Sequence, residues 1–344
     1  MSTATATAAR APAPPTAPFG TVFARRMAIT WHRGGSWGPS ELRDTGPIPM
    51  HPGAHVLHYS SACFEGLKAF RHPDGKARVF RLDRHVARMC QSARLLCLPP
   101  PDPAQLEAMV LDVVRECRDE IPAFPGALYL RPTLIGTEVN IGAAGTPPSE
   151  VCLYVLASPV GDYFGAGLQP VRVAVEDEHP RTTADFGMAK AGANYASALR
   201  HVMQARAEHE AATVLFCPGG DVQETGASNF MLLDDQRLVT KPLSGAFLHG
   251  VTRDSVLRLA AHLGYTVEER DFTVDEMLDW CGRGEAALSG TAAVLAGVGT
   301  LIHHGREVQV GGGQVGPNTR RLREALTAIQ SGEAEDPFGW LREV

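Results

Sequence analysis

A glycine-rich segment near the middle of the chain, residues 161–167, constrains the fold more than any other feature. Glycine weakens helices and strands, so this cluster predicts a loop between folded parts. The chain has 344 residues, more than one ordinary hydrophobic core holds together, and two domains are therefore expected. We predict a small N-terminal domain over residues 19–163, an interdomain linker over residues 164–177 and a large C-terminal domain over residues 178–344.

Hydrophobic spacing predicts both helices and strands. Apolar residues recur at helical spacing over residues 82–97, and Asp102 followed by Pro103 marks the start of another helix. Within residues 55–70 we predict short extended runs together with a turn at Gly66. Further helices are predicted at residues 194–208, 251–263, 274–281 and 317–330, and strands at residues 77–80, 127–135, 151–158, 171–175, 213–217, 265–270 and 285–288. The sequence therefore predicts an α+β fold without internal repeats.

Charge and hydropathy exclude several classes of protein. Hydrophobic residues make up 44% of the chain and charged residues 20%, which is typical of a globular protein. The net charge of -6 comes without a basic cluster, so neither nucleic acid nor an anionic membrane is expected as a partner. The longest apolar runs, such as residues 153–157, are too short to span a bilayer. Residues 1–18, rich in Ala, Thr and Pro, predict a disordered arm rather than a signal peptide.

Cysteine and histidine are scattered along the chain. None of the seven cysteines forms a Cys-x-x-Cys pair, so free thiols in a reducing cytoplasm are expected rather than disulfides or structural zinc. Among the 13 histidines only His303 and His304 are adjacent, and they have no carboxylate or cysteine partner at ligand spacing in the sequence. We therefore expect no metal site.

The segment from Lys190 to Tyr195, Lys-Ala-Gly-Ala-Asn-Tyr, suggests imine chemistry. A lysine amine can bond an aldehyde, and the small residues that follow let a flat cofactor lie against the backbone. The Tyr195 phenol can reach an oxygen on such a ring. Glu224, from a later extended run, can keep a ring nitrogen protonated and so make the ring an electron sink. A lone lysine is usually a solvated surface group, so the neighbouring residues carry this interpretation.

Two predicted turns and one arginine could bind a phosphate. Residues 250–252, Gly-Val-Thr, open a predicted helix, whose free amides and dipole favour an anion. Residues 289–291, Ser-Gly-Thr, form a second turn with a hydroxyl group and little bulk. Arg88 could add a bidentate contact from the other domain. Each feature alone also fits an ordinary helix start or a surface arginine.

Several segments, in their order along the chain, resemble those of branched-chain amino acid aminotransferases, which are pyridoxal phosphate enzymes of fold type IV and aminotransferase class IV. The matching segments are residues 58–59, 64–71, 129–133, 190–195, 224–229, 250–253, 289–293 and 335–340. One segment would be weak evidence, whereas the ordered set is specific. The resemblance implies a two-domain fold, with a smaller α/β N-terminal domain and a larger C-terminal domain that has a β-barrel-like sheet core.

The resemblance also implies a role for each matching residue. Lys190 would form the Schiff base with pyridoxal 5'-phosphate, Tyr195 would hydrogen-bond its phenolic oxygen, and Glu224 would pair with its pyridine nitrogen. The phosphate would be held by Arg88, Val251, Thr252 and Thr291. The substrate side would consist of Tyr59, Phe64, Tyr129, Arg131 and Tyr163, with Thr291 and Ala292 offering backbone amides to the substrate carboxylate.

The implied reaction is transamination of leucine, isoleucine or valine with 2-oxoglutarate, by a cytoplasmic homodimer or larger homo-oligomer that takes small-molecule substrates. Three alternatives stay open. One is a related transaminase with a shifted amino donor, from secondary metabolism or with D-amino acids; the others are an aminodeoxychorismate lyase and a cofactor-binding protein without turnover. The chain departs from the family's usual residues at Ala193, His249 and Gly297 and next to Glu224, which leaves the substrate range open.

Overall fold

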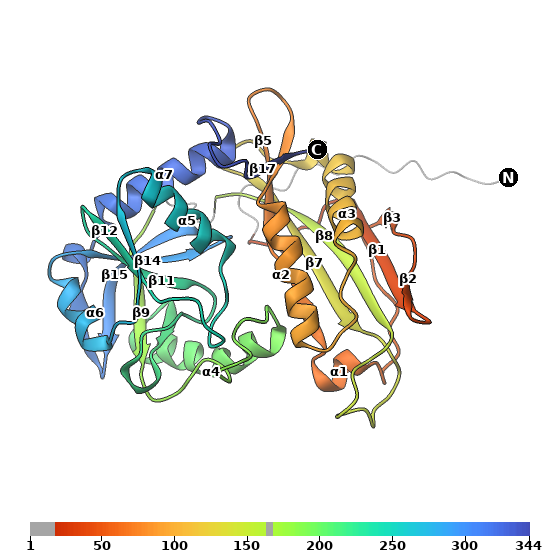
Figure 1. The fold of residues 1–344 in the computed structure, drawn as a ribbon, viewed down its shortest axis with the longest axis horizontal. Coiled ribbons are helices and arrows are strands. Elements are labelled where there is room, and N and C mark those ends of the chain that lie inside the picture. The colour runs from red at the N-terminus through yellow and green to blue at the C-terminus, as the bar shows by residue number, and fades with distance from the viewer. Residues whose placement is uncertain (1–17, 163–167) are drawn as a thin grey trace.

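The computed structural model describes residues 18–162 and 168–344. Within them the chain forms two units that lie side by side, each built on a β-sheet with helices packed against it (Figure 1). The predicted α+β fold with two domains is confirmed. Residues 1–17 of the predicted arm and Tyr163 lie outside the described residues.

The first unit contains a nine-stranded sheet in which all paired strands are antiparallel. Its order is β17-β6-β5-β7-β8-β1-β2, with β3 beside β1 and β4 beside β7. A short helix, α1 (His55–Tyr59), precedes β4. The strands are β1 (Arg26–Arg33), β2 (Ser36–Trp37), β3 (Glu41–Asp44), β4 (Ala62–Phe64), β5 (Leu67–Arg71), β6 (Ala77–Phe80), β7 (Ala127–Gly136), β8 (Val151–Val160) and β17 (Leu341–Glu343).

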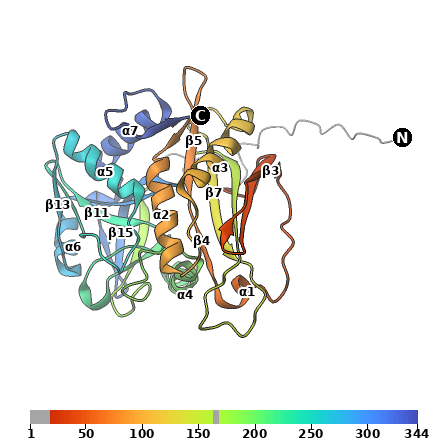
Figure 2. The ribbon, with the colours of Figure 1, turned by 45° about the vertical axis from the view of Figure 1, so that its right-hand side comes forward.

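Two longer helices, α2 (Leu82–Leu95) and α3 (Pro103–Glu116), pack on the core of this sheet. In two views α2 lies between the two sheets (Figures 1 and 2). Its buried face forms because apolar residues recur every three to four positions, as predicted. Helix α3 also begins as predicted, because the Asp102 side chain accepts a hydrogen bond from the Gln105 N–H at 2.8 Å.

The second unit contains an eight-stranded, mixed sheet. Its order is β10-β9-β15-β14-β11-β12-β13, with β16 beside β15, and β9 runs parallel to both of its neighbours. The strands are β9 (Val171–Glu176), β10 (Thr213–Phe216), β11 (Asn229–Leu233), β12 (Arg237–Thr240), β13 (Thr266–Glu269), β14 (Glu285–Gly290), β15 (Val294–His303) and β16 (Arg306–Gln309). The helices are α4 (Gly192–His209), α5 (Val251–His262), α6 (Val274–Cys281) and α7 (Pro317–Ser331).

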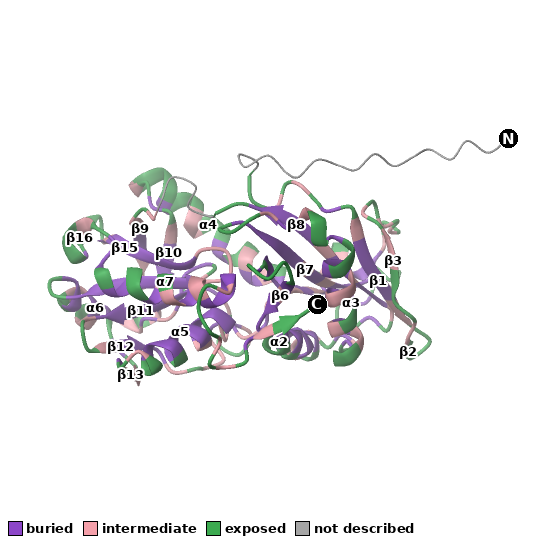
Figure 3. Ribbon diagram, turned by 90° about the horizontal axis from the view of Figure 1, so that it is seen from above, coloured by how far each residue is buried: buried purple, intermediate pink, exposed green. Residues whose placement is uncertain are grey.

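One hydrophobic cluster joins the two units. It contains Phe70 and Tyr129 from the first sheet together with Met231, Leu257 and Leu322 from the second unit. The central strands of both sheets are largely buried, as the view from above shows (Figure 3). The two sheets are therefore parts of one packed molecule. Within the described residues, every helix is too short or too polar to traverse a lipid bilayer.

Hydrogen bonding places two strands in units other than those that the sequence predicts. Strand β9 falls within the predicted linker, residues 164–177, yet it pairs with β10 and β15 in the second sheet. Strand β17 falls within the predicted C-terminal domain, yet it pairs with β6 in the first sheet. A strand belongs to the sheet whose strands form hydrogen bonds with its backbone N–H and C=O groups, whatever its position along the chain. We therefore infer that the second unit begins by Val171 and ends before Leu341.

Most predicted elements occur close to their predicted bounds, with two kinds of exception. The start of the predicted extended region forms helix α1 instead, which ends at Ser60 in the left-handed conformation. Strands β1, β2, β3, β11, β12, β15, β16 and β17 were not predicted. Every residue of β11 is buried, and a strand buried on both faces lacks the alternation of apolar and polar residues that predicts a strand.

Replacing Trp340 with alanine should lower the free energy of unfolding by about 3–5 kcal/mol, as for other buried tryptophans. Trp340 is 5% exposed, and its ring centroid lies 5.7 Å from that of Phe80 and 4.1 Å from that of Phe338. Urea unfolding followed by circular dichroism measures the change. The control is Met203→Ala, at a side chain that is 51% exposed and should contribute less than about 0.5 kcal/mol. Equal effects of the two substitutions would contradict a stabilising role for the C-terminal segment.

Candidate active site

Lys190 lies between the two units, directly before helix α4. Its backbone N–H donates to Ser92 Oγ at 3.0 Å, and its carbonyl oxygen accepts from the Phe64 N–H at 3.0 Å. Ser92 belongs to α2 and Phe64 to β4, both in the first unit. The backbone of the lysine is thus fixed by the opposite unit, while its side chain is half-buried.

The amine of Lys190 contacts the phenol of Tyr195. Nζ lies 2.7 Å from Tyr195 Oη and 4.9 Å from the centroid of the Phe64 ring. Tyr195 is in the first turn of α4, which brings its side chain back toward the lysine. Burial raises the pKa of Tyr195, but the charge and hydrogen bond of Lys190 outweigh it, so this pKa lies below its ordinary value of 10. This pair can hold and pass a proton.

The side chain of Asn194 fixes the chain segment that leads to Lys190. Its Nδ2 donates to the carbonyl oxygens of Phe186 at 3.0 Å and Ala189 at 2.9 Å. Its Oδ1 accepts from Thr182 Oγ1 at 2.8 Å. The buried amide therefore ties the irregular segment that precedes Lys190 to the start of α4, which fixes where the lysine enters the site.

Glu224 is a buried carboxylate, 2% exposed, between β10 and β11. One oxygen accepts hydrogen bonds from Arg181 Nη1 and, at 3.0 Å, from the Leu248 N–H. The other oxygen accepts from Asn229 Nδ2 at 3.1 Å. Burial raises the pKa of Glu224 to about 7, although Arg181 and the Leu248 amide act in the opposite direction. The carboxylate is held in one orientation and is sensitive to any further charge near it.

Arg181 is a residue of this site that the sequence analysis missed. It is 2% exposed, and besides Glu224 its Nε donates to the Gly226 carbonyl at 3.3 Å. Its guanidinium carbon lies 5.7 Å from the centroid of the Tyr195 ring. It therefore links two predicted cofactor residues. The only signal in the sequence is its position shortly before Lys190, which no spacing rule connects to Glu224.

Arg88 is buried in an ion-pair cluster and is not a surface arginine. Its Nε and Nη2 donate to the two oxygens of Glu65 at 2.7 and 2.8 Å, and His85 Nδ1 lies 2.6 Å from the same carboxylate. Its Nη1 donates to the His249 carbonyl in the second unit at 3.0 Å. Burial raises the pKa of Glu65, but Arg88 and His85 outweigh it and hold this pKa well below its ordinary value.

The N-terminus of helix α5 follows the carbonyl that Arg88 contacts. Gly250 is the N-cap, and a Cβ there would lie 2.0 Å from an oxygen of Asn229, so a larger residue does not fit. Val251 and Thr252 follow in the first turn, whose N–H groups have no partners within the helix. Arg88, Gly250 and Val251 line a cavity of about 250 Å³. A cation beside the positive end of a helix can hold a phosphate group.

Aromatic side chains and an arginine line a second cavity, of about 410 Å³. Phe64, Tyr129, Arg131 and Tyr154 are among its lining residues. The guanidinium carbon of Arg131 lies 4.6 Å from the Phe64 ring centroid, and its Nη2 donates to Tyr129 Oη at 2.9 Å. A Cβ at position 66 would lie 2.0 Å from that hydroxyl, so a residue larger than glycine does not fit there. The cavity can accept an apolar group and, at Arg131, a carboxylate.

Two cations hold the turn between β14 and β15, which contains Thr291 and Ala292. Lys68 Nζ donates to the Ala292 carbonyl at 2.9 Å, and Arg323 Nη1 donates to the carbonyl of Ala293. Burial is the main reason why the pKa of Lys68 falls to about 8. Neither cation was predicted, although Lys68 lies within one of the segments that carry the family resemblance. These contacts fix the carbonyl groups of the turn.

The predicted site residues differ in whether the structure brings them close to Lys190. The charges of Lys190 and Arg88 both lower the pKa of Glu224, so these three groups share one electrostatic environment. Tyr59 is different, because its hydroxyl donates to the Ile141 carbonyl and no described contact joins it to Lys190. The remaining predicted substrate residue, at position 163, lies outside the described residues.

The contacts of the adjacent histidines also differ from those expected from the sequence. The sequence analysis found no carboxylate at ligand spacing from His303 and His304, yet the fold brings Asp177 to both. Asp177 Oδ2 lies 2.9 Å from His303 Nε2 and 3.2 Å from His304 Nε2. The contact joins the end of β9 to the turn after β15, a pairing that arises from the parallel register of these two strands.

Known aminotransferases are similar to this chain in sequence. The family model described as Amino-transferase class IV matches residues 62–298, more than half of the chain. A relative from Streptomyces coelicolor, named "Probable branched-chain-amino-acid aminotransferase", is 38% identical over 334 residues, which cover 94% of this chain and 91% of the relative. "Branched-chain-amino-acid transaminase 1" of Bacillus subtilis is 35% identical over 343 residues, which cover 97% of this chain and 96% of the relative.

The fold is similar as well. The crystal structure of a T.th. branched-chain amino acid aminotransferase with pyridoxamine 5'-phosphate matches with a TM-score of 0.76 and 27% identity, covering 94% of this chain and 99% of that chain. In this chain Arg181 links buried Glu224 to the ring of Tyr195, whose hydroxyl contacts Lys190 Nζ. The chain belongs to the class IV aminotransferase family. All three similar proteins carry the name branched-chain amino acid aminotransferase or transaminase.

Replacing Glu65 with glutamine should lower the free energy of unfolding by about 3–5 kcal/mol, because it leaves the Arg88 guanidinium buried without its counter-charge. The effect should depend on pH. The folded-state pKa of Glu65 lies below its ordinary value of 4.5, so the stabilisation is present above that pH and is lost as the pH falls below it. Denaturant unfolding near neutral pH and again in acid measures both effects.

The matched control for this substitution is Glu107→Gln. Glu107 lies 3.1 Å from Arg342 at an exposed position, where an ion pair contributes about 0–1 kcal/mol. A Glu65→Gln variant no less stable than this control near neutral pH would contradict the importance of the buried cluster.

Proposed function

We propose that this chain transfers the amino group of leucine, isoleucine or valine to 2-oxoglutarate, with pyridoxal 5'-phosphate as its cofactor. The observation that carries the proposal is the 2.7 Å contact between Lys190 Nζ and Tyr195 Oη, in the same electrostatic environment as the buried carboxylate of Glu224. The names of the related proteins support the same activity. The pyridoxamine 5'-phosphate in the T.th. enzyme structure supports the cofactor.

The residues at the site fit this cofactor. Arg88 and the first turn of α5 suit its phosphate, with Val251 and Thr252 offering amides, and Glu224 suits its ring nitrogen. Ser289 gives an independent indication, because its hydroxyl is buried and has no hydrogen-bond partner among the described residues. Ser289 pairs with Asn229 across β14 and β11. A buried hydroxyl without a partner is costly, so its position favours a polar ligand here.

Lys190 is the proposed catalytic residue. When bound, pyridoxal 5'-phosphate supplies an aldehyde that takes up the amino group and a ring that delocalises negative charge. The Lys190 amine can accept the proton from the substrate α-carbon and return it on the other side of the transferred nitrogen. The hydrogen bond that Nζ donates to Tyr195 Oη holds the amine in place for this transfer. General acid–base catalysis of this kind contributes about 10²–10⁴-fold to the rate.

Glu224 and its partners set the charge opposite the ring nitrogen. Arg181 and the Leu248 N–H hold one carboxylate oxygen, and Asn229 holds the other, so the group cannot rotate away. In the protein alone burial raises the pKa of Glu224 to about 7. A protonated nitrogen beside it lowers this pKa, because opposite charges favour the ionised forms of both groups. Glu224 therefore keeps that nitrogen charged.

The aromatic cavity is the proposed substrate pocket. Its apolar surface, provided by Phe64 and Tyr129 among others, suits an aliphatic side chain. Arg131 stands at the same cavity and can pair with the second carboxylate of glutamate or 2-oxoglutarate. One pocket then serves both half-reactions. Thr291 and Ala292, in the turn that Lys68 holds, are the proposed site for the α-carboxylate.

We infer that the enzyme is at least a homodimer, with Tyr59 near the interface. The apolar side chains of Leu57, Val139 and Ile141 are 60%, 56% and 68% exposed. Tyr59 donates to the carbonyl of Ile141, so these groups gather around one loop of the first unit. Exposed apolar groups that cluster are typical of protein–protein contacts. A second copy of the chain would cover them.

We also infer a cytoplasmic location. All seven cysteines are free, and all except Cys97 are buried. Burial raises the pKa of Cys63, Cys152 and Cys281, which keeps these thiols protonated and unreactive. A chain with seven unpaired thiols suits a reducing compartment.

Lys190→Ala should abolish the visible absorbance of the bound cofactor and lower turnover by at least about 10²-fold, because the variant lacks the amine that bonds the aldehyde and moves the proton. Spectroscopy and keto-acid release from leucine with 2-oxoglutarate measure the two losses. Lys76→Ala, at an exposed lysine that pairs with Glu343, is the control. Full activity of Lys190→Ala, or wild-type protein that takes up no pyridoxal 5'-phosphate, would refute the proposed function.

Arg131→Gln should raise the KM for 2-oxoglutarate by about 10–100-fold, the effect of losing a hydrogen bond to a charged group, and change the KM for leucine much less. Steady-state kinetics with each substrate varied in turn separate the two effects, and Arg115→Gln at an exposed arginine is the control. Equal changes for both substrates would assign Arg131 to a general structural role. The same assay with D-amino acids, and without an acceptor, tests the donor-shifted and lyase alternatives.

A further inference from the structure

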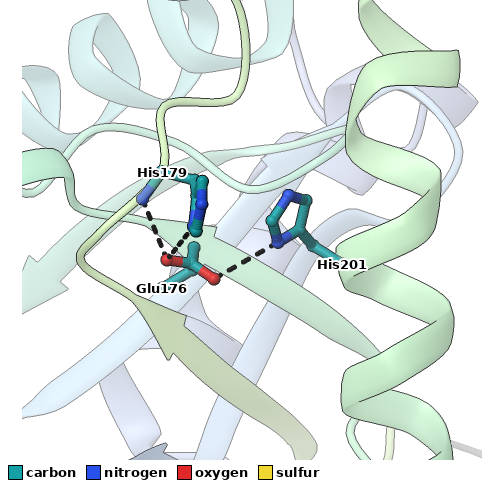
Figure 4. Close-up of side chains that lie close together, drawn as sticks. All are labelled: Glu176, His179 and His201. Carbon is teal, nitrogen blue, oxygen red and sulfur yellow. Dashed lines mark hydrogen bonds and ion pairs between the residues drawn. The ribbon is translucent and has the colours of Figure 1, made fainter.

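Three side chains from separate parts of the chain converge at the end of β9. Glu176 is the last residue of that strand, His179 follows in the next loop, and His201 belongs to helix α4. Both imidazole rings face the Glu176 carboxylate (Figure 4). Oε1 lies 3.2 Å from His179 Nδ1, and Oε2 lies 3.2 Å from His201 Nδ1. The three ligand atoms lie within 4.8 Å of one another.

The backbone fixes the orientation of this carboxylate. Glu176 Oε1 accepts hydrogen bonds from the N–H groups of Glu178 and His179, both at 2.9 Å. Oε2 therefore points toward His201. Carboxylates that bind metal ions are commonly held by hydrogen bonds of this kind, which orient the free oxygen before the ion arrives.

The donor set and its dimensions suit a small divalent ion. Two imidazole nitrogens and a carboxylate oxygen bind zinc at about 2.0–2.2 Å, and at tetrahedral angles such ligand atoms lie about 3.4 Å from one another. The two nitrogen–oxygen distances of 3.2 Å in this cluster are close to that value. Imidazole and carboxylate together favour zinc, nickel or copper over magnesium or calcium, which prefer oxygen alone.

We propose that Glu176, His179 and His201 bind one divalent transition-metal ion, with zinc as the representative, at a site separate from the aminotransferase centre. The ion would join the loop after β9 to helix α4. Both elements continue into that centre, because Arg181 lies two residues beyond His179 and Tyr195 lies on the same helix as His201. Bound metal therefore stabilises the elements that present Arg181 and Tyr195.

The neighbouring cluster of Asp177, His303 and His304 is the competing site. There, both imidazole nitrogens contact the same oxygen of Asp177, and the two rings lie with their centroids 4.0 Å apart. Glu176 instead offers a separate oxygen to each histidine. The Glu176 carboxylate is also oriented by two backbone N–H groups, and this cluster is the one we assign.

Titration of the tag-free holoenzyme tests this proposal. The protein is first treated with a chelator and transferred to phosphate-free buffer, and then titrated with zinc by calorimetry and with cobalt by visible absorption. The expected result is one ion per chain, a cobalt spectrum of low coordination number and a higher melting temperature with zinc. His201→Ala and Glu176→Gln should each weaken binding at least tenfold and remove the rise in melting temperature.

Two further variants keep the test decisive. His179 is exposed, so His179→Ala should fold normally and still weaken binding at least tenfold. His209→Ala is the matched control, since His209 lies on the same helix beside Glu208 but in none of the three-ligand groups of the described residues. It should leave zinc affinity unchanged.

Three outcomes would overturn the proposal. They are zinc affinity no tighter than millimolar, zinc affinity that His179→Ala and His201→Ala leave unchanged, and zinc affinity that His304→Ala alone abolishes. The last outcome would assign the ion to the competing cluster. None of these outcomes bears on the aminotransferase activity, which is measured separately.

Discussion

The arrangement of the site depends on one buried guanidinium group, that of Arg88. A buried charge is tolerated only when its hydrogen-bonding groups find partners, and Arg88 finds them in both units. Glu65 takes two of its donors within the first unit, and the His249 carbonyl takes another from the second. Because His249 directly precedes the N-cap of α5, this ion-pair cluster also determines where the helix N-terminus lies relative to α2. The contact thus holds the units together at the point where a phosphate would bind.

Lys190 also depends on contacts with both units. Its backbone is hydrogen-bonded to the first unit at Ser92 and Phe64, whereas the helix that follows it packs in the second unit. Glu224 is fixed by partners from the second unit alone. A change in the angle between the units would move the amine relative to the carboxylate. The shared hydrophobic cluster and the Arg88 contacts oppose such a change, so the amine and the carboxylate keep the fixed geometry that the proposed function requires.

The sequence predicted the residues whose chemistry is visible locally. Lys190 and Tyr195 lie within one short segment. Helix α2 was predictable from the spacing of its apolar residues, and helix α3 from the residues at its N-terminus. Arg181, Lys68 and the Asp177 contact of His303 were not predicted, because each depends on residues far away in sequence that only the folded chain brings together. Strands β11 and β15 were not predicted because burial on both faces removes the alternating pattern. For a related reason the sequence did not indicate the sheets that β9 and β17 join, because their backbone partners lie far away in the sequence.

The position of β17 has a consequence for how the protein is made. The first sheet takes its edge strand from Leu341–Glu343, which follows the whole of the second unit in the sequence, and Trp340 beside it fills the cluster between the units. Domains generally fold as they leave the ribosome, N-terminal part first. Here the first unit begins to emerge before the second but is completed only after it, because its edge strand β17 follows the second unit in the sequence. A chain that lacked Trp340 and β17 would therefore be incomplete in both units, and the edge of β6 would be left unpaired.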